Sequence, residues 1–248
     1  NIIEKKGYPI SELVDSRGDK RLIYLDPDNT DNKRSYKTTE GKFYPIPRVK
    51  RNDRECLFVT GPSGSGKSTY VAKYIERFRK IFPKRRIIIF SKVEDDPALD
   101  IYNPIRIEIN NELIENPIKP EELEKSLVIF DDIDTISDNK LKDAVHKIKD
   151  DALQIGRHYQ IYVVVTSHIC KNHNKTKINL IESHSFTFFP SSGSIAGPKS
   201  IMKDYIGLDK KTIERILESG KNSRWVTIYT HFPQFVMSEK EIYLLSNI

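Results

Sequence analysis

The sequence predicts an α/β fold, in which a mostly parallel central sheet is flanked by helices. From residue 55 onward, short apolar segments typical of strands alternate with longer segments that have helical spacing of apolar residues. Two of the short segments, residues 127–130 and 162–166, are apolar on both faces, as expected at the centre of a parallel sheet. This alternation implies right-handed crossover connections, with helices covering the sheet.

The size and composition suit a globular protein with a full core. The chain has 248 residues, of which 38% are hydrophobic and 31% charged; this fits one α/β domain with extensions better than two independent domains. No apolar run approaches the roughly 18–20 residues that cross a bilayer, so no membrane span is expected. The first residues lack the apolar core and cleavage site of a signal peptide, and the missing initiator methionine leads us to expect residues upstream.

The net charge and the number of cysteines say less about the partners and the cellular compartment than the composition says about the fold. The 41 basic and 35 acidic residues give a net charge of +6, which permits a polyanionic partner without requiring one. Cys56 and Cys170 are too few for a disulfide framework, which indicates a reducing compartment.

Two parts are expected along the chain. Residues 1–54 are polar and interrupted by prolines, with short strands expected at residues 22–25 and 42–44. They predict a short β-rich N-terminal extension. Residues 55–248 predict the α/β domain, which ends in further helices and strands.

The elements of that domain follow from apolar spacing and from end signals. Helices are expected at residues 67–80 and 139–155, and Ser137 suits the N-cap of the second helix while Gly156 suits its end. Two more helices are expected near residues 198–205 and 210–219. Strands are expected at residues 56–60, 86–91, 106–109, 127–130, 162–166, 185–189, 225–229 and 241–245.

A glycine-rich loop joins the first strand of the domain to its first helix. The loop matches the pattern G-x-x-x-x-G-K-[ST], which is typical of a phosphate-binding P-loop, in the strand–helix context that this motif requires. A chance Gly/Ser-rich turn is the alternative. The nine residues of the expected nucleotide site are Gly61, Pro62, Ser63, Gly64, Ser65, Gly66, Lys67, Ser68 and Thr69.

This spacing has a physical purpose. Backbone N–H groups of the loop and the positive end of the new helix together form an anion site, and glycines let phosphate oxygens approach closely. Lys67 is expected to reach the β- and γ-phosphates of ATP, and the Ser68 hydroxyl to bind Mg²⁺.

Two carboxylates follow the strand at residues 127–130. Asp131 is expected to hold Mg²⁺ directly or through water, because this strand end faces the phosphate loop in P-loop proteins. Asp132 is then placed to act as a base or to orient water near the γ-phosphate. The alternative is that Asp132 only caps a turn and that Asp134 is the catalytic carboxylate.

The next strand carries polar residues at its end and an arginine before its start. His168 or Ser167 could sense the γ-phosphate; the alternative for His168 is a loop histidine bonded to backbone. Arg157 precedes the strand, at the end away from the loop, so it is not expected to reach its own nucleotide. It could insert into a neighbouring subunit as an arginine finger, although local chemistry alone favours a surface arginine at a helix C-terminus.

The pattern resembles the FtsK–HerA superfamily of DNA-pumping P-loop NTPases, and most closely the DNA-packaging ATPases of large nucleocytoplasmic DNA viruses. The resemblance spans roughly residues 55–247. It is carried by residues 57–69 (LFVTGPSGSGKST), 127–134 (LVIFDDID), 155–168 (IGRHYQIYVVVTSH) and 223–226 (SRWV).

This resemblance implies an ATPase that hydrolyses ATP with Mg²⁺ and translocates double-stranded DNA through an oligomeric ring, hexameric or pentameric. It implies a trans-finger role for Arg157 and places His168 where the family usually has Gln. Capsid or portal proteins are implied partners, and the host cytoplasm, in a virus factory, or the virion is the implied location.

Other hypotheses remain open from the sequence. A P-loop kinase of nucleosides or nucleic-acid ends shares the loop, and a nucleotide-gated structural protein could bind ATP without useful turnover. Residues 171–177 could form a DNA-facing loop or an ordinary solvated one. A zinc site at His168, Cys170 and His173 is not expected, because the spacing fits no standard site.

Overall fold

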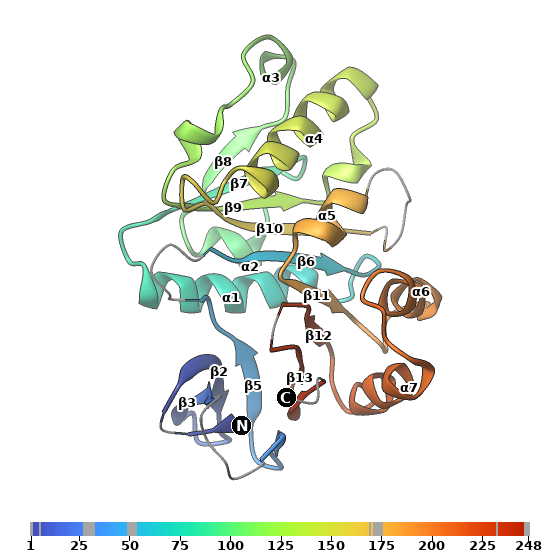
Figure 1. Ribbon diagram of the computed structural model, residues 1–248. Helices are drawn as coiled ribbons and strands as arrows, with labels where there is room; N and C mark the ends of the chain where they lie inside the picture. Colours follow the sequence, from blue (N-terminus) through green and yellow to red (C-terminus); the bar gives the residue numbers. More distant parts are fainter. Residues whose placement is uncertain are drawn as a thin grey trace. The chain divides into compact units, whose positions relative to one another are not determined.

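The chain folds into two compact units (Figure 1). A computed structural model describes residues 2–4, 6–26, 33–48, 54–168, 170, 176–231 and 233–245. The first unit combines Asn1–Arg48 with Ser185–Ile248, and the second is Val49–His184. This grouping differs from the expected division at residue 54, because the C-terminal segment packs with the N-terminal one. Lys42 forms an ion pair with Glu239, 2.8 Å from Nζ to Oε1, and Phe43 donates its N–H to the Glu239 carbonyl.

The second unit is built on a five-stranded parallel sheet. Its central strands are buried along their whole length because their residues are apolar on both faces. Every neighbouring pair is parallel, which confirms the predicted α/β class with its mostly parallel sheet. The order across the sheet is β6 (Cys56–Thr60), β10 (Tyr162–Ser167), β9 (Ser126–Asp131), β7 (Arg86–Ser91) and β8 (Ile105–Glu108).

Helices cover this sheet, since parallel neighbours need crossover connections. One packing group joins α1 with α2, and another joins α4 with α3 and α5 (Figure 1). Because all five strands run the same way, the ends of β6, β7, β9 and β10 meet at one edge. The helices are α1 (Lys67–Ile81), α2 (Pro97–Asp100), α3 (Glu112–Glu115), α4 (Asn139–Gln154) and α5 (Lys177–Glu182), with 3-10 turns η1 (Pro120–Leu123) and η2 (Ile133–Thr135).

The start of α4 corrects one sequence prediction. Asp138, and not Ser137, is the N-cap: its backbone is extended, and its side chain accepts the Leu141 N–H at 2.7 Å. Both residue types can cap a helix, so their order in the sequence did not decide between them. The helix begins at Asn139, as predicted, and the cap is the residue directly before it.

The first unit is antiparallel. A four-stranded sheet has the order β1 (Ile2–Ile3), β3 (Lys20–Leu25), β2 (Tyr8–Val14) and β5 (Lys42–Pro45). A second set of paired strands follows the order β11 (Ser185–Phe188), β12 (Val226–Tyr229), β13 (Phe235–Ser238), β14 (Glu241–Leu244) and β4 (Ser35–Lys37). Helices α6 (Ala196–Asp204) and α7 (Lys210–Ser219) precede β12.

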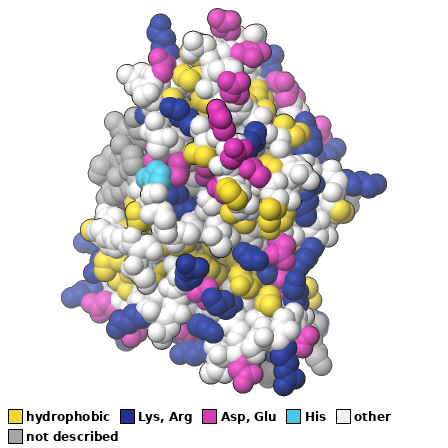
Figure 2. Space-filling model, turned by 180° about the vertical axis from the view of Figure 1, so that it is seen from behind, with side chains coloured by type: hydrophobic (Ala, Val, Ile, Leu, Met, Phe, Trp, Pro, Cys, Tyr) yellow, Lys and Arg dark blue, Asp and Glu magenta, His cyan; other side chains and the backbone are white. Residues whose placement is uncertain are grey.

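Charged side chains of both signs occur on the face of the molecule that Figure 2 shows. On the face in Figure 2, lysines and arginines alternate with acidic and uncharged side chains, so the described atoms of this face form no continuous basic surface. Within the described ranges, no helix is both long and apolar enough to cross a membrane.

Candidate functional site

The glycine-rich loop lies between β6 and α1, as its sequence context predicted. Gly64 and Gly66 have φ of 73° and 107°, a region that favours glycine, and Lys67 is the first residue of α1. The loop is tied to the neighbouring strand β10, because the Gly61 N–H donates to the Ser167 carbonyl at 3.1 Å. Thr69 and the other residues after Gly66 belong to the first turn of the helix, whose positive end therefore faces the loop.

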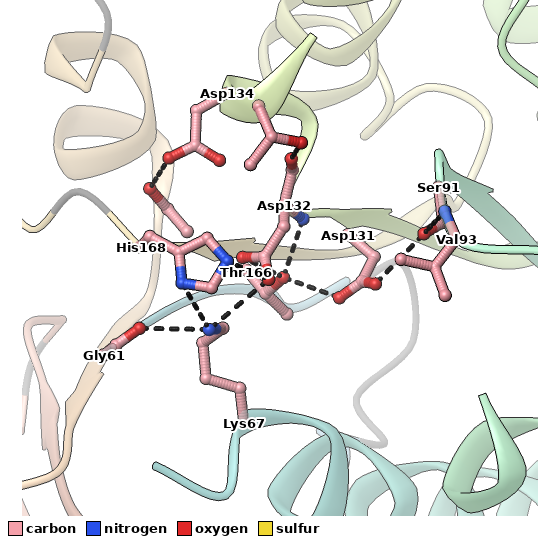
Figure 3. A network of polar contacts seen from close by, with 11 residues as sticks. Gly61, Lys67, Ser91, Val93, Asp131, Asp132, Asp134, Thr166 and His168 are labelled. Carbon is pink, nitrogen blue, oxygen red and sulfur yellow. Dashed lines mark hydrogen bonds and ion pairs between the residues drawn. The ribbon is translucent and has the colours of Figure 1, made fainter. Parts of the chain in front are cut away.

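The Lys67 ammonium group is surrounded by three acceptors (Figure 3). Its Nζ lies 3.0 Å from the Gly61 carbonyl oxygen, 3.2 Å from His168 Nδ1 and 3.4 Å from Asp132 Oδ2. An ammonium group has three N–H donors, so this set uses all of them. The lysine expected to bind phosphate thus has three acceptors within the protein.

His168 connects Lys67 to Asp132. Its Nε2 lies 2.8 Å from Asp132 Oδ2, on the opposite side of the ring from Lys67. Since a lysine can only donate, His168 Nδ1 must accept, and the ring proton therefore sits on Nε2 and is donated to Asp132. The three side chains form a directed chain of hydrogen bonds from Lys67 to Asp132.

The strand end of β9 places two carboxylates differently. Asp131 is 9% exposed, and its two oxygens accept hydrogen bonds from the hydroxyls of Thr166 at 2.8 Å and Ser91 at 3.2 Å. Asp132 has φ 45° and ψ 37°, an uncommon left-handed conformation for a residue other than glycine. This turn ends the strand and brings the Asp132 side chain to Lys67 and His168.

The surroundings of Asp132 raise the pKa of its carboxyl group. Burial is the main cause, since it disfavours the charged form, and the negative charges of Asp131 and Asp134 act in the same direction. Lys67 and His168 oppose the shift without cancelling it. A carboxylate in this setting accepts a proton more readily than a surface aspartate does.

The alternatives left open by the sequence occupy other positions. Asp134 lies in η2, where its Oδ2 accepts from the Ser167 hydroxyl at 2.9 Å. The structure therefore brings Asp132 to Lys67 and pairs Asp134 with Ser167. Of the two polar residues at the end of β10, His168 is the one in contact with Lys67.

Arg157 lies away from these residues, in the exposed turn between α4 and β10. The turn is fixed on both sides. Before it, the Arg54 guanidinium donates to the carbonyls of Ala152, at 2.5 Å, and of Leu153. After it, Arg85 Nη2 donates to the Gln160 side-chain oxygen at 3.0 Å.

The donor set fits a magnesium ion. Ser68 is the second residue of α1, next to Lys67, and Asp131 is the last residue of β9 at the same sheet edge; both offer oxygen atoms, which Mg²⁺ prefers. Among the described residues, each Asp131 oxygen has one protein donor, so further lone pairs remain for a metal or its waters.

Residues 171–175, which include His173, were expected as part of a DNA-facing loop and lie outside the described residues.

Sequence reasoning missed Thr166, Ser91 and Arg54. Thr166 and Ser91 lie in the last two residues of the strands on either side of β9, at the level of Asp131, a position that their strand patterns could have signalled. Arg54 precedes the first strand of the domain. Nothing in its sequence position indicated that its guanidinium would cap the C-terminal end of α4.

A phosphate loop at a parallel sheet edge, with paired carboxylates on the strand that faces it, defines a P-loop NTPase. Residues 53–192 match the sequence profile of the AAA domain family, and the chain belongs to this family. It is similar to the uncharacterized protein V3 of the Sputnik virophage, with 37% identity over 239 residues that cover 96% of this chain and 95% of the relative.

Solved structures that are similar to this chain include a viral DNA-packaging ATPase and a conjugation coupling protein. One is B204, the DNA-packaging ATPase of Sulfolobus turreted icosahedral virus, with 15% identity, coverage of 80% of this chain and 100% of that chain, and a TM-score of 0.49. Another is the pCW3 conjugation coupling protein TcpA with ATPγS, with 10% identity, coverage of 99% and 87%, and a TM-score of 0.49. At these identities the likeness concerns the fold alone.

Proposed function

We propose that this P-loop NTPase hydrolyses ATP to translocate double-stranded DNA, and that it packages a viral genome into a capsid. The observation that carries the ATPase part is the meeting of Lys67, Asp131, Asp132 and His168 at one sheet edge (Figure 3). The family match supports the nucleotide-binding part. The DNA part is supported by the sequence resemblance at residues 155–168.

The site suggests how this chain's residues would act on ATP. The amides of the loop and α1 would bind the phosphates, and Lys67 would exchange Asp132 and His168 for the β- and γ-phosphate oxygens. Asp132, released from Lys67, would orient a water and take its proton as the water oxygen bonds to the γ-phosphorus. The bond from that phosphorus to the β–γ bridging oxygen would break, which leaves ADP and phosphate.

Ser68 and Asp131 would hold Mg²⁺, which neutralises phosphate charge when it is bound. His168 would respond to the γ-phosphate, because its Nδ1 loses the Lys67 donor when Lys67 turns to the nucleotide. The sensor role of His168 thus follows from the same exchange of partners as the catalytic role of Asp132.

Arg157 would serve a neighbouring subunit. It is exposed, and it lies at the edge of the sheet opposite the phosphate loop, in a turn that Arg54 and Arg85 fix. A head-to-tail arrangement of copies in a hexameric or pentameric ring would bring it to the next nucleotide. Capsid or portal proteins and a location in the host cytoplasm or the virion belong to the same proposal.

Steady-state ATP hydrolysis with and without double-stranded DNA tests the proposal. We expect hydrolysis that DNA stimulates, its loss in Lys67→Ala, and nucleotide binding without turnover in Asp132→Asn. Lys73→Ala is the matched control, since Lys73 lies on the same helix and pairs with Glu76 at the surface. Phosphate transfer to nucleosides or nucleic-acid ends would instead favour a kinase, and binding without turnover in the wild type a nucleotide-gated structural protein.

A further inference from the structure

Two hydroxyl groups hold the metal-side carboxylate from opposite sides. Thr166 is the next-to-last residue of β10 and Ser91 is the last residue of β7, the two strands that flank β9 in the sheet. The Thr166 hydroxyl lies 2.8 Å from Asp131 Oδ1, and the Ser91 hydroxyl 3.2 Å from Asp131 Oδ2. Each carboxylate oxygen therefore has its own hydroxyl donor (Figure 3).

Both hydroxyls are oriented by a backbone amide. The Asp132 N–H donates to Thr166 Oγ1 at 3.0 Å, and the Val93 N–H donates to Ser91 Oγ at 3.1 Å. With the amide N–H occupying one lone pair, the single hydroxyl proton is left to donate, and the nearest carboxylate acceptor is an Asp131 oxygen in each case, at 2.8 Å for Thr166 and 3.2 Å for Ser91. The same arrangement, amide to hydroxyl to carboxylate, thus occurs twice around one side chain.

Thr166 has a second connection. Its Oγ1 lies 3.3 Å from Asp132 Oδ1, and it accepts the N–H of Asp132, the residue in the left-handed conformation. Thr166 is 1% exposed, so water cannot replace these bonds readily. Its hydroxyl therefore fixes both the rotation of the Asp131 carboxylate and the turn that directs Asp132 to Lys67.

We propose that Thr166 and Ser91 are positioning residues that orient Asp131 for a magnesium ion, and that Thr166 also couples this orientation to Asp132. The inference rests on the proposed ATPase function. Donors that orient a metal-binding carboxylate are important for affinity, and their loss typically costs about 10- to 100-fold in metal affinity or activity.

The test is the Mg²⁺ concentration that gives half-maximal binding of a fluorescent ADP analogue, with kcat measured beside it. Thr166→Val keeps the shape and removes the hydroxyl, and we expect the required Mg²⁺ to rise about 10- to 100-fold. Ser91→Ala should raise it less, because its bond to Asp131 is longer. Thr166→Ser restores a hydroxyl and should return the requirement close to that of the wild type.

Thr187→Val is the matched control. Thr187 is also a buried strand threonine, and its hydroxyl lies 2.8 Å from the Thr227 hydroxyl. Both residues belong to the first unit, whereas Thr166 belongs to the second, so Thr187→Val reports the general cost of replacing a buried threonine with valine. An unchanged Mg²⁺ requirement in Thr166→Val, or an equal change in Thr187→Val, would overturn the inference. If Thr166→Val does not fold, an unchanged requirement in Ser91→Ala overturns it. A wild type whose nucleotide binding ignores Mg²⁺ would contradict the proposed function itself.

Discussion

At the scale of single residues, Asp132 combines an unusual backbone conformation with a partly buried charge. A left-handed conformation at a residue other than glycine is often found at functional sites, where surrounding bonds maintain it. Here the bond from its N–H to Thr166 and the contacts of its side chain with Lys67 and His168 provide that support. These contacts therefore keep the Asp132 side chain beside Lys67.

The raised pKa of Asp132 predicts how stability depends on pH. A carboxyl group whose pKa is higher in the folded than in the unfolded state stabilises the fold below the unfolded pKa, and loses that contribution as the pH rises through the folded pKa. In magnesium-free buffer without nucleotide, Asp132→Asn should therefore gain melting temperature relative to the wild type over the pH range that begins at the unfolded pKa of aspartate, about 4, and extends upward. Thermal unfolding of both proteins measures this, and a difference that is constant or shrinks over the range would refute it.

The sequence was sufficient for the residues that have a characteristic spacing. Lys67 and Asp131 follow from the loop and from the apolar strand before the carboxylates, and both lie at the predicted sheet edge. The sequence placed Asp132 near the γ-phosphate with Asp134 as the alternative; the left-handed turn that accompanies the contact of Asp132 with Lys67 is not encoded in the spacing. Thr166 and Ser91 were missed because a hydroxyl at the end of a strand is common and becomes meaningful only beside Asp131.

At the scale of elements, the turn between α4 and β10 is unusually constrained for an exposed segment. Gly156 is buried there, and a Cβ on it would lie 2.2 Å from the Ala152 carbonyl oxygen and 2.7 Å from Arg54 Nη1. Glycine is thus required for Arg54 to approach the end of the helix. Its position directly before Arg157 links the packing of this turn to the exposed arginine.

Gly156→Ala should consequently displace the turn. We expect a loss of about 1–3 kcal/mol in the free energy of unfolding from the steric overlap, together with lower ATPase activity and retained nucleotide binding. Gln154→Ala, at an exposed position of the same helix end, is the control and should change neither. Chemical denaturation and nucleotide titration provide the measurements; full activity in Gly156→Ala would show that the turn tolerates the side chain.

The N-terminus of α4 offers a test of the observed cap. Asp138→Ala removes the acceptor of the Leu141 N–H and should lower the free energy of unfolding by about 1 kcal/mol. Ser137→Ala changes the neighbouring residue, which the sequence pattern favoured, and should have almost no effect. Equal losses in the two variants in urea unfolding would contradict the assignment of Asp138 as the cap.

Long periodic elements were predictable, and short ones less so. The pattern located α4 and the buried strands to within two residues, because their apolar residues face a core on known sides. Sequence reasoning did not find β2, β13 or the one-turn helix α2. These segments are short or mix polar and apolar residues, and tertiary pairing determines their structure.

At the scale of the whole molecule, the fold separates the residues around Lys67 from Arg157. The residues to which we assign nucleotide chemistry lie at one edge of the parallel sheet of the second unit, and Arg157 lies at the opposite edge of that sheet. A single copy therefore cannot bring Arg157 to its own Lys67, whereas repeated head-to-tail contacts could bring it to the next copy.

Mixing of variants tests this expectation. Arg157→Ala should lower kcat by ~10³-fold or more, if the arginine stabilises the transition state as a finger does. Addition of Asp132→Asn subunits, which are inactive but keep Arg157, should partly restore hydrolysis by the Arg157→Ala subunits. Hydrolysis that stays at the level of the separate variants over all mixing ratios would count against a role in trans.

ATP-driven displacement of a third strand from a DNA triplex measures movement along double-stranded DNA directly. We predict that the wild-type protein releases the third strand only when ATP and Mg²⁺ are present, and that Asp132→Asn, which still binds nucleotide, releases none. A wild-type protein that hydrolyses ATP in the presence of the triplex and yet leaves the third strand bound would contradict the assignment as a DNA translocase.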